Sequence, residues 1–169
     1  MSLALRDARP GDQGVVAEFI RELAQYEKLS HEVVVDEASL TTHLFGERPA
    51  AYVVIAEWDG APAGFALYFF TFSTFLGRPS LYLEDLFVRP ALRGKGIGEA
   101  VLRALAARAV ERGCGRMEWS VLDWNEPALG FYKKLGAVPM NDWTVHRVTG
   151  PALDALARRM PPGRGDGSI

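Results

Sequence analysis

The sequence contains a single cysteine, Cys114, among its 169 residues. One cysteine cannot form a disulfide within the chain, and such sparing use is typical of proteins kept in a reducing compartment. Residues 1–12 also lack a basic segment followed by an apolar one, which is the pattern of a secretory signal. We therefore expect a cytoplasmic protein.

Long hydrophobic runs and an excess of charge are missing as well. The longest apolar run, residues 65–75, falls short of the roughly 20 residues that cross a membrane, and its Thr and Ser residues favour a buried strand. The 19 Lys and Arg residues nearly balance the 21 Asp and Glu residues, which gives no support to a general nucleic-acid or membrane surface. The three histidines lack metal-ligand spacing. We expect no nucleic-acid, membrane or metal partner, so any anion site must be local.

The first half of the chain carries both strand and helix patterns. Leu3 and Leu5 alternate with polar neighbours, which predicts a short strand. Asp12 offers an N-cap for a helix over residues 12–27, and a second, shorter helix follows Asp36. Three strand-like runs come next, and their short links predict an antiparallel meander. These runs are residues 51–58, 64–72 and 81–88.

After Pro90 the apolar residues change to a helical period. One apolar stripe begins at Ile97, and Gly113 is placed to end that helix. A further helix opens at Asn125, whose side chain can cap it. Strand patterns lie on both sides of this helix, at residues 117–124, 137–140 and 143–148.

The order of these elements, β-α-α-β-β-β-α-β-α-β-β, defines the fold class. It predicts a mixed α/β or α+β layer in which helices flank a mainly antiparallel sheet, because the alternation required by a uniformly parallel sheet is missing. The length suits one domain, which we place at residues 1–160. We expect the remaining tail, residues 161–169, to be disordered.

A glycine-rich stretch, RGKGIG at residues 93–98, joins the last meander strand to the next helix. It is not a nucleotide-binding P-loop, because Lys95 is followed by glycine rather than by Ser or Thr. It is not a dinucleotide fingerprint either, because Glu99 stands where the third glycine is required. A strand, a loop with little side-chain bulk and a helix amino terminus can instead hold a pyrophosphate. A tight turn without a ligand is the alternative.

Two ordered blocks make the chain resemble the GNAT superfamily of acetyl-CoA-dependent N-acetyltransferases. Arg93, Gly96 and Gly98 match the signature Gln/Arg-x-x-Gly-x-Gly/Ala, and Asn125 followed by EPALGFYKKLGA matches a second family block. The resemblance extends over residues 3–148 to the branch of diamine (polyamine) and thialysine acetyltransferases. Segments similar to that branch are ELAQYEKL, FGERP, LYLEDLFV, RGKGIG and LDWNEPALGFYKKLGA.

The resemblance implies the GNAT acyl-CoA N-acyltransferase fold and acetyl-CoA as the acetyl donor. It also implies that coenzyme A is held by the strand before the glycine-rich loop, by the loop and by the second block. The residues so assigned are Leu86, Phe87, Val88, Arg93, Gly94, Lys95, Gly96, Ile97, Gly98, Glu99, Asn125 and Tyr132.

Acetyl transfer to an alkylamine requires a base, because the amine has a reference pKa of about 10.4 and is mostly cationic at neutral pH. Glu84 and Asp85 lie in the strand before the loop, and adjacent strand residues point to opposite faces. The resemblance assigns Glu84 as a base that acts through water and as part of the amine site. A structural carboxylate is the alternative for Glu84, and Asp85 is either structural or part of the amine site.

Tyr132 is the expected acid, which would protonate the departing thiolate of coenzyme A. A core position is the alternative for a tyrosine on a helical apolar stripe. In the family, backbone N–H groups of a bulged strand stabilise the thioester oxygen, and the corresponding residues here are 86–88.

The substrate is expected to be a small primary amine. Glu27, which follows Tyr26, matches an acidic position of the polyamine enzymes, but Ser73 and Phe75 stand where those enzymes carry Asp and Trp. A lysine-like amine or short diamine is therefore favoured over a polyamine. A protein-modifying acetyltransferase and a non-catalytic acyl-CoA sensor are further alternatives. The resemblance also implies a homodimer. The substrate-binding candidates are Tyr26, Glu27, Phe75, Glu84 and Asp85.

Overall fold

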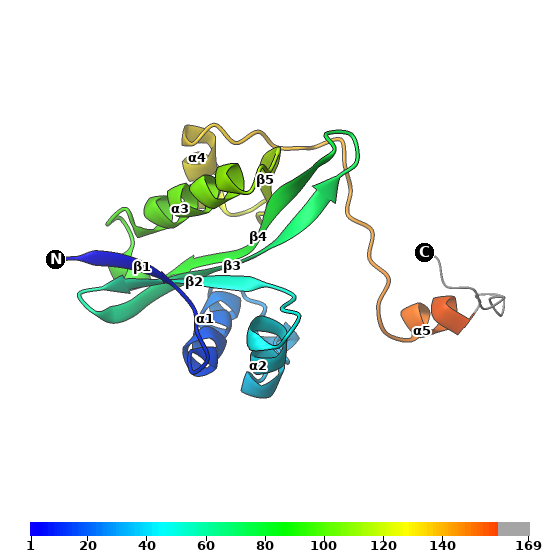
Figure 1. Ribbon diagram of the computed structural model, residues 1–169, viewed down its shortest axis with the longest axis horizontal. Helices are drawn as coiled ribbons and strands as arrows, with labels where there is room; N and C mark the ends of the chain where they lie inside the picture. Colours follow the sequence, from blue (N-terminus) through cyan, green and yellow to red (C-terminus); the bar gives the residue numbers. More distant parts are fainter. Residues whose placement is uncertain (159–169) are drawn as a thin grey trace. The chain divides into compact units, whose positions relative to one another are not determined.

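The computed structural model describes residues 1–158, which fall into two compact units, Met1–Leu122 and the residues from Asp123 onward. The tail expected at residues 161–169 lies outside the described residues, and the single domain expected over residues 1–160 stays a prediction. Figure 1 shows the elements of the first unit, a sheet with helices on both faces. These elements are β1 (Leu3–Asp7), α1 (Gln13–Tyr26), a 3-10 turn (Ser30–Glu32), α2 (Glu37–Phe45), β2 (Tyr52–Trp58), β3 (Ala61–Ser73), β4 (Arg78–Val88), a 3-10 turn (Pro90–Leu92), α3 (Ile97–Glu111) and β5 (Arg116–Trp119).

The sheet has five strands in the order β1-β2-β3-β4-β5. The first four strands pair antiparallel, which confirms the predicted meander. β5 pairs parallel with β4 because α3 carries the chain back across the sheet before β5 begins. The prediction of a mixed, mainly antiparallel sheet flanked by helices is therefore confirmed.

The main core forms between α1 and the sheet, on the face that also carries α2 (Figure 1). Phe19 of α1 stacks on Phe65 of β3 with ring centroids 5.4 Å apart. Phe87 of β4 also contacts the ring of Phe19. All three side chains are buried. Each burial contributes roughly 1.5–3 kcal/mol, so α1 holds β3 and β4 in place.

α3 covers the opposite face of the sheet, as its predicted apolar stripe requires (Figure 1). Ile97, Val101 and Leu105 of this stripe are buried. Gly113 has φ +69°, and Cys114 N–H donates to the Ala109 carbonyl over 2.9 Å, so the helix ends where glycine predicts.

The two aspartates predicted before helices behave differently. Asp36 caps α2 by accepting a 2.7 Å hydrogen bond from Ser39 N–H. Asp12 precedes α1 without capping it, and that part of the prediction is wrong. Its carboxylate instead accepts two hydrogen bonds from the Arg6 guanidinium, at 2.8 and 3.0 Å. These charge-assisted bonds are stronger than a neutral cap and hold the pKa of Asp12 below its usual value.

The second unit contains α4 (Glu126–Lys134) and α5 (Gly150–Arg158). Asn125 accepts a 3.4 Å hydrogen bond from Ala128 N–H, which confirms the predicted cap of α4. The strands predicted at residues 137–140 and 143–148 are wrong, because residues 137–149 form neither strand nor helix. A strand requires a neighbouring edge, and Pro139 has no N–H to donate to one.

At Gly64 the backbone of β4 leaves no space for a side chain on β3, which yields a test of the packing. A Cβ at Gly64 would lie 2.4 Å from the Phe87 carbonyl oxygen and 3.2 Å from the Val88 Cα. We expect Gly64→Ala to lower the free energy of unfolding by about 1–3 kcal/mol, because the two strands must separate. Denaturant unfolding measures the change. Gly14→Ala is the control, since its Cβ finds ordinary space in α1 and should cost nothing.

Candidate active site

The glycine-rich loop presents free backbone N–H groups at the start of α3. The first hydrogen bond of the helix runs from Ala100 N–H to the Gly96 carbonyl at 3.0 Å, so the amides of residues 97–99 have no acceptor within the helix. Gly94 and Gly96 have φ +77° and +79°, a conformation that side chains disfavour. A Cβ at either position would meet no atom within 4 Å. The loop is therefore open to a ligand, and its amides and helix terminus suit a phosphate.

Two cations border this loop. Arg93 donates from Nε to the Val88 carbonyl at 3.0 Å, and its guanidinium lies 4.3 Å from the ring centroid of Tyr26. The Lys95 ammonium lies 5.3 Å from the ring centroid of Trp58. Both cations are exposed. These aromatic contacts hold positive charge beside the free amides, where a diphosphate would need it.

The edge of β4 that faces β5 is open over its second half. Pairing between the two strands ends at Leu83 and Trp119, because β5 is shorter than the strand predicted at residues 117–124. From Glu84 to Val88, β4 has no strand neighbour on this side in the described part of the chain. Backbone N–H groups along this edge are thus available to an extended ligand or to a developing oxyanion.

A bulge in β4 lies next to this opening. Leu67 of β3 pairs with Asp85, whereas the next residue, Tyr68, pairs with Leu83. Glu84 is therefore the extra residue of the bulge. Cross-strand partners share a face of the sheet, so Leu83 lies on the α3 face with Tyr68, and Asp85 lies on the α1 face with Leu67.

The bulge changes the interpretation of Glu84 and Asp85. The expectation that they point to opposite faces holds for a regular strand, and the register shift at Glu84 removes that basis. The bulge also lies at Glu84, before residues 86–88 where it was expected. Asp85 thus shares the α1 face with Phe87, on the side where Tyr26 and Glu27 end α1.

Three carboxylates interact around the bulge. The pKa of Asp85 is raised to about 6. Burial is the largest cause, and the negative charges of Glu84 and Glu27 add to it. Burial also raises the pKa of Glu27. Asp85 and Glu27 are half-buried, whereas Glu84 is exposed. Because a nearby cation would lower these pKa values, the cluster is arranged to receive positive charge.

The position of Glu27 depends on an unusual helix ending. Leu29 N–H donates to the Ala24 carbonyl at 2.8 Å and Lys28 N–H to the Gln25 carbonyl at 3.2 Å, which is the Schellman pattern. Lys28 takes the left-handed position of this motif with φ +62°. Glycine is the usual residue there, so the sequence carried no signal for this turn.

The remaining predicted residues lie elsewhere. Phe75 is fully exposed at the tip of the β3–β4 hairpin. Arg78 begins β4 just after this tip, and Glu84 follows it by six positions, which is about 20 Å at the rise of a strand. The first unit therefore does not bring Phe75 to the carboxylates. Asn125 and Tyr132 belong to the second unit, where Tyr132 contacts Phe131 with ring centroids 5.6 Å apart.

Comparison with known proteins identifies the architecture. A family model described as Acetyltransferase (GNAT) family matches residues 17–137. The chain belongs to this family. A thialysine N-epsilon-acetyltransferase of Bos taurus is 40% identical over 164 residues, covering 90% of this chain and 96% of that protein. An L-ornithine N5-acetyltransferase of Arabidopsis thaliana is 32% identical, covering 90% and 86%.

A solved structure agrees with this assignment. An integron cassette protein from the mobile metagenome of V. cholerae superposes with a TM-score of 0.77 at 30% identity, covering 94% of this chain and 99% of that one. The GNAT chain is an N-acetyltransferase, and its acetyl donor is acetyl-CoA. Among residues 1–158, no helix has the length and apolarity to cross a bilayer, and no group of three or more His, Cys, Asp or Glu side chains could hold a metal ion.

The raised pKa of Asp85 makes the stability of this GNAT protein depend on pH. The folded state binds the Asp85 proton more tightly than the unfolded state, whose carboxyl has a pKa of 3.8, so stability falls as pH rises toward 6. We expect Asp85→Asn to raise the free energy of unfolding at pH 8 by up to about 3 kcal/mol and to change little below pH 4. Denaturant unfolding across this pH range measures it. An equal gain at both ends would contradict the assignment, and Glu47→Gln, an exposed carboxylate after α2, is the control.

Proposed function

We propose that the chain transfers the acetyl group of acetyl-CoA to a primary amine of a small molecule, either a lysine-like amino acid or a short diamine. The observation that carries this proposal is the cluster of Glu27, Glu84 and Asp85 beside the open edge of β4. A cationic amine relieves the repulsion within that cluster and lies next to the place for a thioester. The relatives named for thialysine and L-ornithine support an amino acid with a side-chain amine.

Coenzyme A would bind along a path that the resemblance and the open backbone groups support together. Its diphosphate would accept hydrogen bonds from the loop and the first turn of α3, with Arg93 and Lys95 adding charge. Its pantetheine arm would follow the unpaired edge of β4 and the side chain of Asn125. The residues proposed for coenzyme A are Leu86, Phe87, Val88, Arg93, Gly94, Lys95, Gly96, Ile97, Gly98, Glu99, Asn125 and Tyr132.

The reaction we propose is direct attack in a ternary complex. The bound ammonium loses a proton through water to Glu84, whose exposed carboxylate is accessible to solvent. The neutral nitrogen attacks the thioester carbon, and backbone N–H groups of β4 stabilise the oxyanion. The C–S bond then breaks, Tyr132 donates its phenolic proton to the thiolate, and the second proton of the attacking nitrogen leaves through water and restores the phenol of Tyr132. The products are the N-acetylated amine and free coenzyme A.

Asp85 would set the affinity for the cation in this mechanism. A carboxyl with a pKa near 6 is charged at neutral pH and loses its charge in mild acid. The amine KM should therefore rise as pH falls through 6. Tyr26 and Glu27 would form the adjoining wall of the amine site.

A polyamine is the second candidate substrate, and the three clustered carboxylates favour it, since a longer cation would neutralise more of them. The departure from the polyamine enzymes at Ser73 and Phe75 argues for the smaller amine. A peptide amine would need an open groove, and a comparison of free amines with peptides separates that case.

We also propose a cytoplasmic homodimer. Apolar side chains are exposed at the β3–β4 hairpin, including Phe72 and Phe75, and along residues 138–148, including Trp143 and Val145. A second copy would cover the exposed side chains of each unit, supply a neighbouring edge to residues 137–149 and bring Phe75 to an amine site. Sedimentation at micromolar concentration should give the mass of two chains, and a monomer would refute the dimer. We infer no nucleic-acid or membrane partner from the balanced charge.

A screen of thiol release from acetyl-CoA tests the proposed reaction. We expect thialysine, lysine, ornithine and short diamines to be acetylated faster than spermidine, aminoglycosides or peptides. Tyr132→Phe should lower kcat on the order of 10²-fold with nearly unchanged binding of acetyl-CoA, because only the proton donor is lost. Unchanged turnover would exclude Tyr132 as the acid. Release with none of these amines would refute the substrate class.

A pair of glycine variants tests the diphosphate site. Gly96→Ala places a methyl group in the open space of the loop at φ +79°, and we expect the dissociation constant of coenzyme A to rise about tenfold or more. Gly98→Ala has an ordinary contact with Val88 at 3.9 Å and matches the family signature, so it should bind normally. Calorimetric titration measures both. Equal affinities in the two variants would place the diphosphate elsewhere.

A further inference from the structure

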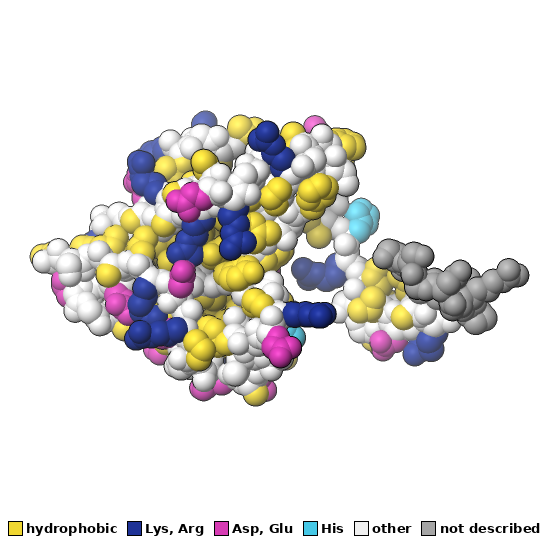
Figure 2. Space-filling view, in the orientation of Figure 1, with side chains coloured by type: hydrophobic (Ala, Val, Ile, Leu, Met, Phe, Trp, Pro, Cys, Tyr) yellow, Lys and Arg dark blue, Asp and Glu magenta, His cyan; other side chains and the backbone are white. Residues whose placement is uncertain are grey.

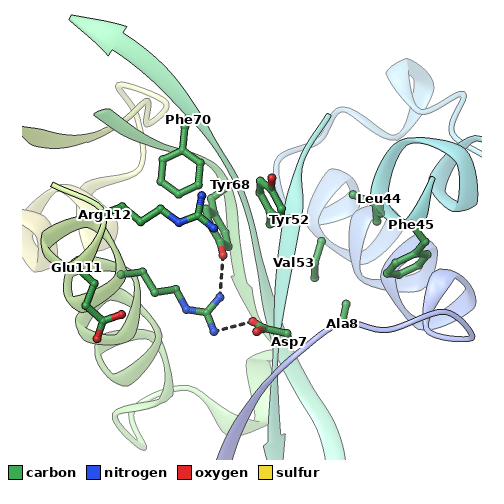
Figure 3. A pocket seen from close by; sticks show the side chains of 11 residues that line it. Asp7, Ala8, Leu44, Phe45, Tyr52, Val53, Tyr68, Phe70, Glu111 and Arg112 are labelled. Atoms are coloured by element: carbon green, nitrogen blue, oxygen red, sulfur yellow. Dashed lines mark hydrogen bonds and ion pairs between the residues drawn. The ribbon is translucent and has the colours of Figure 1, made fainter. Parts of the chain in front are cut away.

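A cavity lies in the first unit, away from the glycine-rich loop. It has a volume of about 450 Å³ and is bordered by the end of β1, the start of β2, β3, the end of α2 and the last turns of α3 (Figure 3). The loop lies at the other end of α3, whose 15 residues extend about 22 Å. The cavity is therefore separate from the acetyl-transfer site, and its volume falls within the usual range of small-molecule sites.

One wall of the cavity consists of aromatic rings. Tyr52, Tyr68 and Phe70 form a mutually contacting cluster with centroid separations of 5.6, 6.0 and 5.9 Å. Leu44 and Val53 also border the cavity, but from the other face of the sheet, toward α2 (Figure 3). Figure 2 shows basic side chains next to hydrophobic ones between α3 and the sheet. The cavity thus combines an apolar side with a basic one.

Two arginines from α3 supply the basic side, and they differ in their partners. Arg108 donates to the Tyr68 hydroxyl at 2.7 Å and pairs with Asp7 at 2.6 Å, so its charge is compensated. Arg112 lies over Phe70 at 4.7 Å and over Tyr52 at 6.0 Å from the ring centroids. Within residues 1–158, no carboxylate pairs with Arg112.

The charge of Arg112 is therefore available to a ligand. The neighbouring Glu111 also borders the cavity, but its carboxylate points away from the aromatic cluster (Figure 3). A guanidinium that lies on aromatic rings keeps its in-plane N–H groups, which match both oxygens of a carboxylate. Two arginines and two carboxylates thus border the cavity, and among the described residues Arg112 is the arginine of this pair that no carboxylate pairs with.

We propose that this cavity binds an organic monocarboxylate with an apolar body. The carboxylate would accept hydrogen bonds from Arg112, and the hydrocarbon part would pack against Tyr52 and Phe70. The site requires neither acetyl-CoA nor the amine. Its occupancy is therefore independent of the proposed function.

Titration of the full chain with phenylacetate, followed by two-dimensional NMR, tests this site. We expect saturable shifts confined to residues around the cavity. Phenylacetamide, which has the same shape without the charge, and inorganic phosphate, which has charge without the apolar body, should each bind at least about tenfold more weakly. Saturating acetyl-CoA should leave the phenylacetate dissociation constant unchanged.

Substitutions test the basic side and the apolar side of the cavity one at a time. Arg112→Gln and Phe70→Leu should each weaken phenylacetate binding by about tenfold, whereas Arg21→Gln, an exposed arginine on α1, should not. The proposal is overturned if phenylacetate does not bind in the millimolar range, if phenylacetamide or phosphate binds equally well, if Arg112→Gln binds normally, or if acetyl-CoA displaces the ligand. Retained thiol release in Arg112→Gln confirms that this exposed side chain is not needed for folding.

Discussion

The pairing of β4 changes at one residue, Glu84, and the proposed acetyl-transfer site is arranged around that change. Up to Leu83, β4 has partners on both sides, and its side chains alternate regularly between the two faces of the sheet. At Glu84 the register with β3 shifts, and immediately before it the pairing with β5 ends. One extra residue therefore turns Asp85 toward α1 and leaves the following backbone N–H groups open along the other edge. The carboxylates proposed for the amine and the N–H donors proposed for the thioester thus come from the same short stretch of chain.

The cost of this arrangement is electrostatic. Asp85 is half-buried beside two like charges, which raises its pKa to about 6 and weakens the folded state at neutral pH. Packing around Phe19, Phe65 and Phe87 holds the bulged strand in place despite this repulsion. Functional sites commonly hold like charges that destabilise the folded state, and the packing of the core compensates for that destabilisation.

Much of the fold was predictable from local patterns, because the apolar periods of α1 and α3 and the capping residues of α2 and α4 agree with the elements they form. The glycine-rich loop was equally clear, since positive φ at Gly94 and Gly96 needs glycine. Asp12 was missed as an Arg6 partner because that ion pair depends on the tertiary placement of β1. A bulge was implied by the family resemblance alone, because one inserted residue leaves the strand pattern of LYLEDLFV intact. The turn at Lys28 was missed for lack of glycine, and the predicted strands at residues 137–148 need an edge that local sequence cannot supply.

The open carboxylate cluster also has a consequence for the resting enzyme. Before any amine arrives, the field of Glu27, Glu84 and Asp85 attracts whatever small cations the solution contains. Sodium, potassium or a protonated buffer would then screen the cluster and compete with the amine, more strongly as ionic strength rises. The apparent affinity for an amine would therefore depend on the ionic strength and on the cations in solution as well as on the protein.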